Sequence, residues 1–203
     1  GCGPAVSDSI YVHVFDDFVL GSISQDQTIC FGSNTDTLNF IINSTGGGNS
    51  YSYYWQYSYN QTDWFDTIVN AEIFHPGNLF DSTYYRAHVS SNFNCGSGFS
   101  NSILVSVYDQ FNPGQIISGD TICKFEIPNN LSFSNLPSGA DGLYTYQWQS
   151  KNYGSNLWSN IGLVDSLTNN ISFSPGVMID TTSYRIIVNS SCKTDTTNDV
   201  LIV

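Results

Sequence analysis

The amino-acid sequence predicts an all-β protein built from repeated domains, and three observations point to this fold class. The 203 residues are 40% hydrophobic and 15% aromatic, which is enough to fill a hydrophobic core. Only 2 of the 17 acidic residues are Glu, and Ser, Thr, Asn, Gly and Tyr replace the usual helix-forming residues. Motifs of the first half of the chain also recur in the second half.

The repeat is seen as a shift of 93 residues that grows to 99 after an insertion. The matched pairs are Cys2 with Cys95, Cys30 with Cys123, Trp55 with Trp148, Tyr85 with Tyr184, Arg86 with Arg185, and Cys95 with Cys192. We therefore expect three segments along the chain. Residues 1–18 are the last strand of a truncated preceding repeat, residues 19–111 are one repeat, and residues 112–203 are a repeat whose last strand is cut short.

Short runs of alternating apolar and polar residues predict strands within each repeat. Ile10, Val12 and Val14 alternate with polar or aromatic neighbours, and so do the residues around Tyr85 and Tyr184. About seven such strands per repeat is the number found in an immunoglobulin-like β-sandwich. We therefore expect tandem immunoglobulin-like β-sandwich repeats in a rod-like array.

Two aromatic residues in each repeat form the expected core signature. Trp55 and Trp148 should fill the middle of their sandwiches. Tyr85 and Tyr184 should be buried nearby, with a corner hydrogen bond from each hydroxyl to the backbone.

Five cysteines suggest a disulfide framework with one thiol left over. We expect Cys30–Cys95 and Cys123–Cys192 bonds, each closing one repeat at a sandwich end. Cys2 corresponds to Cys95, so its partner is expected upstream and it is unpaired in this fragment. A metal site is the alternative, but no close Cys-x-x-Cys pair occurs. Disulfides indicate an oxidising, extracytoplasmic environment.

Charge and hydropathy exclude two classes of partner. The net charge of −12 would repel nucleic acid and anionic bilayers. No apolar run approaches the ~20 residues of a membrane helix, so we expect no membrane insertion.

The sequence does not predict an enzyme. His13, His75 and His88 have no counterpart in the neighbouring repeat and lie in no metal-binding motif, and no nucleophile elbow occurs. The 15 Asp residues leave a carboxylate pair for glycoside hydrolysis open, although a small sandwich has little concave surface.

Two groups of charged residues have a structural and a binding interpretation. Arg86 and Arg185 recur and should point outward, either as clamps for an anion, or as cross-strand partners for Asp, or as lids over an aromatic ring. Asp16, Asp17 and Asp109 lie at the repeat junctions and are weak candidates for a Ca²⁺ site. No other cofactor is expected.

Eight of the 15 Asp residues precede Ser or Thr, more often than composition explains. The residue after the hydroxyl is always Ile, Leu or Thr. Turn chemistry accounts for the first two positions of this tripeptide but not for the restricted third.

The ordered motifs resemble a known family. Thr28-Ile29-Cys30, the Y-x-Y-x-W-Q strand, a second Trp at 64 or 158, F-x-P-G, Tyr-Arg and a closing Cys are similar to the tandem immunoglobulin-like repeats of giant Bacteroidota cell-surface proteins. The gliding-motility adhesins exported by the type IX secretion system are the members most like this chain. One departure is Ser183-Tyr184 where the other repeat has Tyr84-Tyr85.

The resemblance implies a non-catalytic structural segment of a large adhesin filament on the bacterial cell surface, for surface attachment and gliding. Its partners would be neighbouring repeats, surface polysaccharide, and the gliding machinery through other parts of the parent protein. The resemblance also implies O-glycosylation of the eight hydroxyl residues that follow Asp. These are Ser9, Thr37, Thr67, Ser82, Thr121, Ser166, Thr181 and Thr196.

Two alternative functions remain. The first is a carbohydrate-binding module that uses Tyr54, Tyr57, Tyr59 and Trp64 as a stacking platform, although the second repeat does not preserve that set. The second is an accessory module of a secreted multidomain enzyme.

Overall fold

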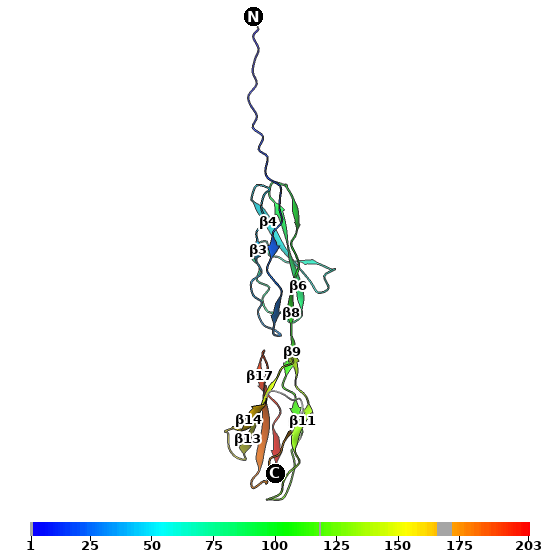
Figure 1. Cartoon of the computed structure of the whole chain (residues 1–203), viewed down its shortest axis with the longest axis vertical. Coiled ribbons are helices and arrows are strands. Elements are labelled where there is room, and N and C mark those ends of the chain that lie inside the picture. The colour runs from blue at the N-terminus through cyan, green and yellow to red at the C-terminus, as the bar shows by residue number, and fades with distance from the viewer. Residues whose placement is uncertain (1, 118, 166–171) are drawn as a thin grey trace. The chain divides into compact units, whose positions relative to one another are not determined.

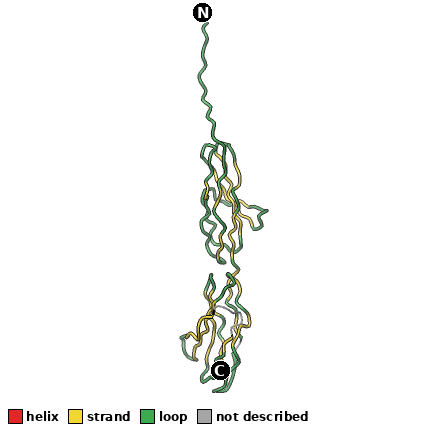
Figure 2. Tube along the Cα trace, viewed as in Figure 1, coloured by secondary structure: helices red, strands yellow, loops and turns green. Residues whose placement is uncertain are grey.

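A computed structural model describes residues 2–117, 119–165 and 172–203 of the chain. Its described elements are all strands, joined by turns and loops, with no helix among them (Figures 1 and 2). The all-β fold class predicted from the sequence is therefore confirmed. In the same described ranges, no element has the helical length and apolarity that a membrane-crossing helix needs.

The chain divides into two compact units whose boundaries do not follow the sequence repeats. Unit 1 comprises Gly1–Gln27, Asn34–Asn78 and Ser82–Ser106, and unit 2 comprises Thr28–Ser33, Leu79–Asp81 and Val107–Val203. Two short segments of the first repeat thus belong, by their contacts, to unit 2.

The strands of the first repeat form a six-stranded sheet and a two-stranded sheet. The larger has the order β2-β8-β6-β4-β5 with β7 also paired to β6, and the smaller pairs β1 with β3. Their bounds are β1 Ser22–Ile23, β2 Gln27–Ile29, β3 Phe40–Ile42, β4 Tyr51–Ser58, β5 Phe65–Asp66, β6 Thr83–Ser91, β7 Ser97–Phe99 and β8 Ile103–Val107.

Unit 2 has the corresponding arrangement. Its main sheet has the order β14-β13-β16-β17, with β18 also paired to β16, beside a β10-β11-β15 sheet and a β12-β9 pair. Their bounds are β9 Asp109–Asn112, β10 Gln115–Ile116, β11 Leu131–Asn135, β12 Ser138–Ala140, β13 Thr145–Asn152, β14 Ser159–Asp165, β15 Ser172–Phe173, β16 Thr182–Asn189, β17 Thr194–Thr196 and β18 Val200–Ile202.

Aromatic side chains from the two sheets meet in the core of each sandwich. In unit 1 the ring of Phe40 on β3 lies 6.3 Å from that of Trp55 on β4. In unit 2 the ring of Phe133 on β11 lies 5.7 Å from that of Tyr146 on β13. Strands of separate sheets therefore cover one hydrophobic layer, as a β-sandwich requires.

The four core-signature residues are buried as predicted. Trp55 is 0% exposed, and Tyr85, Trp148 and Tyr184 are 4%, 7% and 5% exposed. Strands β6 and β16 alternate buried and half-buried residues along their whole length, which matches the period-two pattern of the sequence. Desolvation of its hydroxyl raises the pKa of Tyr85 to about 12, against the smaller opposite effect of a hydrogen bond with Thr83.

The predicted corner hydrogen bond is wrong for Tyr184. Its hydroxyl donates to the sulfur of Met178 at 3.5 Å rather than to a backbone carbonyl. Met178 is itself buried in the same core cluster, so the hydroxyl is satisfied inside the sandwich.

The strand predicted at residues 10–14 is absent from the described part of the chain. Within unit 1 these residues extend away from its strands as a single trace (Figure 1). Ile10, Val12 and Val14 are 89%, 76% and 81% exposed. The alternation of this segment is that of a half-buried strand, but no strand of the described chain pairs with it.

Candidate functional site

The disulfide of the structure is not one of the two predicted pairs. Cys30 bonds to Cys192, with a Cα–Cα distance of 5.5 Å and a sequence separation of 162 residues. Cys95 and Cys123 are free and exposed, and so is Cys2. The predicted Cys30–Cys95 and Cys123–Cys192 bonds are therefore corrected: the bond joins the first repeat of the sequence to the second.

The register of β6 explains why Cys30 cannot reach Cys95. Cys30 follows β2, whose Ile29 carbonyl accepts a hydrogen bond from Tyr108 just beyond β8, and Val105 of β8 pairs with Thr83 at the start of β6. Cys95 lies in the turn that follows the other end of β6, at Ser91. Nine strand residues span about 30 Å, whereas a disulfide needs Cα atoms about 4.4–6.8 Å apart.

The same reasoning separates Cys123 from Cys192 along β16. Ile122 donates a backbone hydrogen bond to Val203, just beyond β18, and Ile202 pairs with Thr182 at the start of β16. Cys192 follows the opposite end of β16, beyond Asn189. Both predicted bonds would have had to run the length of a central strand.

Two tight turns present the bonded cysteines. The Ser33 amide donates to the Cys30 carbonyl at 3.0 Å, and Gly32 between them has a positive φ of 71° that favours glycine. On the other side, the Ser190 amide donates to the Lys193 carbonyl at 2.9 Å, and the Ser190 hydroxyl accepts from the amide of Cys192 at 3.3 Å.

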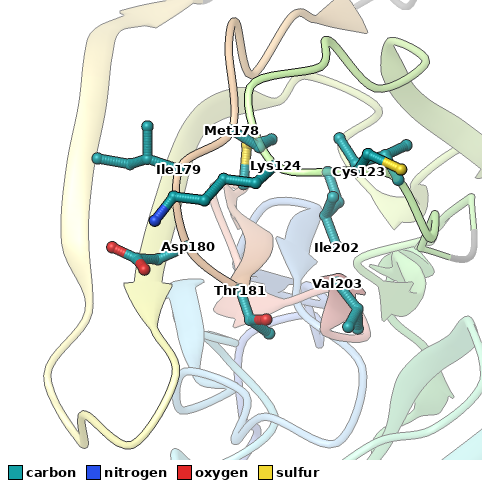
Figure 3. Close-up of a pocket in the computed structure, with 9 residues that line it drawn as sticks. Cys123, Lys124, Met178, Ile179, Asp180, Thr181, Ile202 and Val203 are labelled. Atoms are coloured by element: carbon teal, nitrogen blue, oxygen red, sulfur yellow. The ribbon is translucent and has the colours of Figure 1, made fainter.

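Unit 2 contains a cavity of about 260 Å³ beside the free Cys123 (Figure 3). Its wall combines the Cys123 turn, the segment from Met178 and the end of the chain. The lining residues are Ile122, Cys123, Lys124, Met178, Ile179, Asp180, Thr181, Ile202 and Val203. The lining combines apolar side chains with the charged groups of Lys124 and Asp180, the Thr181 hydroxyl and the Cys123 thiol.

Each recurring arginine makes a cross-strand hydrogen bond and an aromatic stack on the face of its main sheet that points away from the core. Arg86 pairs with Gln56 in the β4–β6 register, and its Nε donates to Gln56 Oε1 at 2.8 Å. The guanidinium lies 4.0 Å from the ring centre of Trp64 and 3.9 Å from that of Phe99. Burial between these rings lowers the pKa of Arg86, partly offset by Tyr54.

Unit 2 repeats this arrangement with one ring. Arg185 Nε donates to Gln149 Oε1 at 2.9 Å, and the guanidinium lies 4.1 Å from the ring centre of Trp158. The interpretation of the arginines as lids over an aromatic ring is thus confirmed, whereas the expected cross-strand partner is a Gln in each unit and not an Asp. The sequence signal for this contact was the second Trp, nine or ten residues after the core Trp.

The proposed sugar-stacking platform does not assemble on one face. Tyr54 and Tyr57 are three residues apart on β4, so their side chains leave opposite faces of the strand. The ring of Tyr54 stacks on His88 at 4.6 Å, Trp64 lies against Arg86, and Tyr57 packs on Phe65. Of the four platform residues, only Tyr59 is mostly exposed, at 62%.

The histidines and acidic residues form no metal centre in the described ranges, where no three His, Cys, Asp or Glu side chains gather. Asp16, Asp17 and Asp109 therefore have no carboxylate cluster around them there, and a Ca²⁺ site stays a prediction. His75 Nδ1 lies 3.1 Å from the Thr37 hydroxyl, and the rings of His13 and Phe15 are 4.5 Å apart.

We expect Arg86→Lys to lower the free energy of unfolding of unit 1 by about 1–2 kcal/mol. Lysine keeps the charge but loses the flat stacking surface and the Nε hydrogen bond. Arg185→Lys is the matched control and should cost about half as much, because one ring stacks on Arg185 in the described part of unit 2. Urea denaturation of the full chain measures both. Equal and negligible losses of unfolding free energy in the two variants would show that the arginine stacks do not stabilise the fold.

His88 should make unit 1 less stable in mild acid. Burial, and then the positive charge of Arg86, lower the pKa of His88 in the folded chain. Because the unfolded chain then binds more protons, stability falls as the pH drops through the unfolded pKa of about 6.5. Urea midpoints at about pH 7.5 and about pH 5.5 test this. His88→Phe keeps a ring that can stack and should reduce the difference between the two urea midpoints. An unchanged difference would show that groups other than His88 cause the pH dependence.

Solved structures similar to this chain are tandem immunoglobulin-like domains. The three N-terminal domains of the Highly Immunogenic Outer Capsid protein (Hoc) of bacteriophage RB49 match with a TM-score of 0.54 and 13% identity, over 92% of this chain and 69% of that one. Titin fragment I67–I69 matches with a TM-score of 0.53 and 8% identity, over 93% of this chain and 64% of that one. Titin domains A168–A170 match with a TM-score of 0.50 and 13% identity, over 91% of this chain and 66% of that one. The chain thus spans about two thirds of each matched chain.

At such low identity the likeness concerns the fold alone, which is that of immunoglobulin-like repeats. No curated protein sequence matches the chain. The family model described as "Domain of unknown function (DUF8696)" matches twice, at residues 19–109 and 112–203. Since these two matches cover nearly the whole sequence, the chain belongs to the DUF8696 family as a tandem pair of its domains.

Proposed function

We propose that this chain is a non-catalytic structural segment of a cell-surface adhesin filament that serves surface attachment and gliding motility. The observation that carries the proposal is a tandem pair of immunoglobulin-like domains in which one disulfide ties the first sequence repeat to the second. A filament needs units that keep their fold under load and junctions that do not come apart. A covalent link between repeats meets the second need.

The shared surface features support a structural rather than a catalytic role. The arginines that recur in both repeats, Arg86 and Arg185, stack on Trp64 and Trp158. Their Nε groups are bonded to Gln56 and Gln149 of the neighbouring strand. The features common to both repeats thus fasten strands and loops to each other.

We further propose an extracellular location on a bacterium of the Bacteroidota, with export by type IX secretion. The disulfide supports an oxidising environment. In this proposal the chain contacts neighbouring repeats, other parts of the filament bind surface polysaccharide, and other parts of the parent protein engage the gliding machinery.

The cellular role is tested with Fab fragments raised against the folded chain and applied to intact cells of the source organism. We expect them to label unpermeabilised cells and to reduce both attachment and gliding. Fab fragments against an unrelated surface protein are the control. Labelling that requires permeabilised cells, or labelling without any effect on attachment or gliding, would refute the proposed role.

O-glycosylation at the Asp-Ser and Asp-Thr sites is part of this proposal. Ser9, Ser82 and Thr121 are exposed, whereas Thr37, Thr67, Thr181 and Thr196 are half-buried. Ser166 lies outside the described residues. Exposed hydroxyls are the more accessible acceptors, so Thr121 is the best site for a test.

The intact mass of the chain purified from its host should exceed that of the polypeptide by the mass of its glycans. Thr121→Val should remove one glycan. Thr194→Val is the matched control, because Thr194 is also exposed but follows Lys193 rather than Asp. A bare polypeptide mass would contradict the glycosylation proposal.

A further inference from the structure

Each free cysteine occupies the same repeat position as a bonded one. Cys123 matches Cys30, the first cysteine of the preceding repeat, and both Cys2 and Cys95 match Cys192, the last cysteine of its repeat. The Cys30–Cys192 bond therefore joins the first cysteine of one repeat to the last cysteine of the next.

We propose that all three free cysteines form bonds of this same kind with adjoining DUF8696 repeats, and that the cavity beside Cys123 is the docking surface for the following repeat. Cys123 would bond to the last cysteine of that repeat. Cys95 would bond to the first cysteine of the preceding repeat, and Cys2 to the first cysteine of the repeat before that. Such bridging depends on the repeat arrangement and not on the cellular role proposed above.

The turn that carries Cys123 has the hydrogen bonds of the turn that carries Cys30. The Glu126 amide donates to the Cys123 carbonyl at 3.1 Å, as Ser33 does to Cys30 at 3.0 Å. The next contact is also the same, because the Phe125 amide donates to Met178 at 2.7 Å and the Gly32 amide donates to Leu79 at 2.8 Å. Cys123 is thus held by the backbone geometry that holds the bonded Cys30.

The middle residue of this turn strengthens the comparison. Phe125 has a φ of 74°, close to the 71° of Gly32, although a positive φ is unfavourable for a residue with a side chain. The second repeat thus keeps the turn geometry of the first, although a positive φ is unfavourable for Phe125.

The turn of Cys95 likewise corresponds to the turn of Cys192. The Ser91 amide donates to the Gly96 carbonyl at 2.9 Å, and the Ser190 amide donates to the Lys193 carbonyl at the same distance. In each turn the serine hydroxyl also accepts from an amide within the turn. The Cys95 turn is two residues longer than the Cys192 turn, but the same pattern of serine hydrogen bonds closes both.

The residues around Cys30 show what should cover Cys123. Thr28–Ser33 and Leu79–Asp81 belong by their contacts to unit 2. Within that unit, Cys30 and Phe31 line a cavity of about 200 Å³ together with residues 109–111, Cys192 and Lys193.

The repeat counterparts of these two segments are residues 121–126 and 178–180. Residues 122–124 and 178–180 line the cavity of Figure 3. By the same arrangement, that cavity should receive the following repeat's counterparts of residues 109–111 and of the Cys192 turn. The exposed apolar side chains of Ile179 and Val203 in its wall would then lose contact with water.

The exposed residues 10–14 independently indicate a preceding repeat. The counterparts of Ile10 and Val12 are Ile103 and Val105 of β8, which are 2% and 0% exposed. Ile10 and Val12 themselves are 89% and 76% exposed. A sheet of a preceding repeat would bury them as β8 is buried, which places a sandwich beside the segment that carries Cys2.

Bond formation is an ordinary two-electron oxidation. Two thiols lose two protons and two electrons as one S–S bond forms, and a disulfide oxidant such as oxidised glutathione is reduced to two thiols. Cys123 and Cys95 are exposed, so an incoming thiol or disulfide can reach them.

The first test counts thiols in the full chain after folding in a glutathione redox buffer. Maleimide labelling followed by intact mass should show three labels, on Cys2, Cys95 and Cys123. Peptide mapping without reduction should recover a Cys30–Cys192 cross-link. A single label, with Cys30–Cys95 and Cys123–Cys192 cross-links, would overturn the proposal.

The second test supplies the missing neighbour by fusing a second copy of residues 107–203 after Val203. We expect Cys123 to lose its label and to be recovered in a cross-link with the copied Cys192. The matched control carries Cys192→Ser in the copy alone and should restore the label on Cys123. The original Cys30–Cys192 cross-link in the same molecule reports that the chain has folded.

A fusion in which Cys123 remains labelled while the Cys30–Cys192 cross-link is present would refute the proposal. So would a bond between the two cysteines of the copy. If the fused chain lacks the Cys30–Cys192 cross-link, the same peptide mapping on the polypeptide purified from its host decides the question, since cross-links within one repeat there would also refute the proposal.

Discussion

The unbroken antiparallel pairing of the two longest strands in each domain is the constraint on which the other features depend. β4 and β6 pair over eight consecutive positions, from Tyr51 with Ser91 to Ser58 with Tyr84, and β13 and β16 do the same. Because side chains alternate across a strand, this single register assigns every residue of the pair to a face. Trp55 and Tyr85 go to the core, while Gln56 and Arg86 go to the other face.

The outer face shows how a polar pair and an aromatic ring fasten a loop to the sheet. The cross-strand pair of Gln56 and Arg86 is fixed by register, and the guanidinium then offers its flat surface to Trp64 from the loop after β4. Gln56 also donates from Nε2 to Asp66 of β5 at 2.7 Å. The Gln56–Arg86 pair thus connects the central strands, the edge strand β5 and the intervening loop.

Much of the fold could be predicted from the sequence because it rests on local periodicity. The alternation around Tyr85 and Tyr184 and the repeated Trp55 and Trp148 identified the class and the core. The disulfides could not be predicted in this way, because repeat spacing does not tell which end of a strand a cysteine occupies. That depends on which strands pair, and Cys30 and Cys95 lie beyond opposite ends of β6.

Residues 10–14 show the other limit of sequence patterns. Their alternation correctly matches that of β8, but a strand forms only where a neighbouring strand supplies hydrogen bonds. The aromatic rings that stack on the arginines could not be identified from the sequence for a related reason. Trp64 and Arg86 are far apart in the sequence, and only the folded sheet brings their side chains together.

The span of the disulfide has a consequence for resistance to peptidases. The Cys30–Cys192 link joins residues that are 162 positions apart, whereas the repeat shift is 93, so successive links of this kind would overlap along the chain. Cleavage of any one peptide bond between Cys30 and Cys192 leaves both fragments attached through sulfur. With overlapping links, a single nick anywhere in the interior of the array would fail to shed its distal end, and release would require a reductant as well as a peptidase.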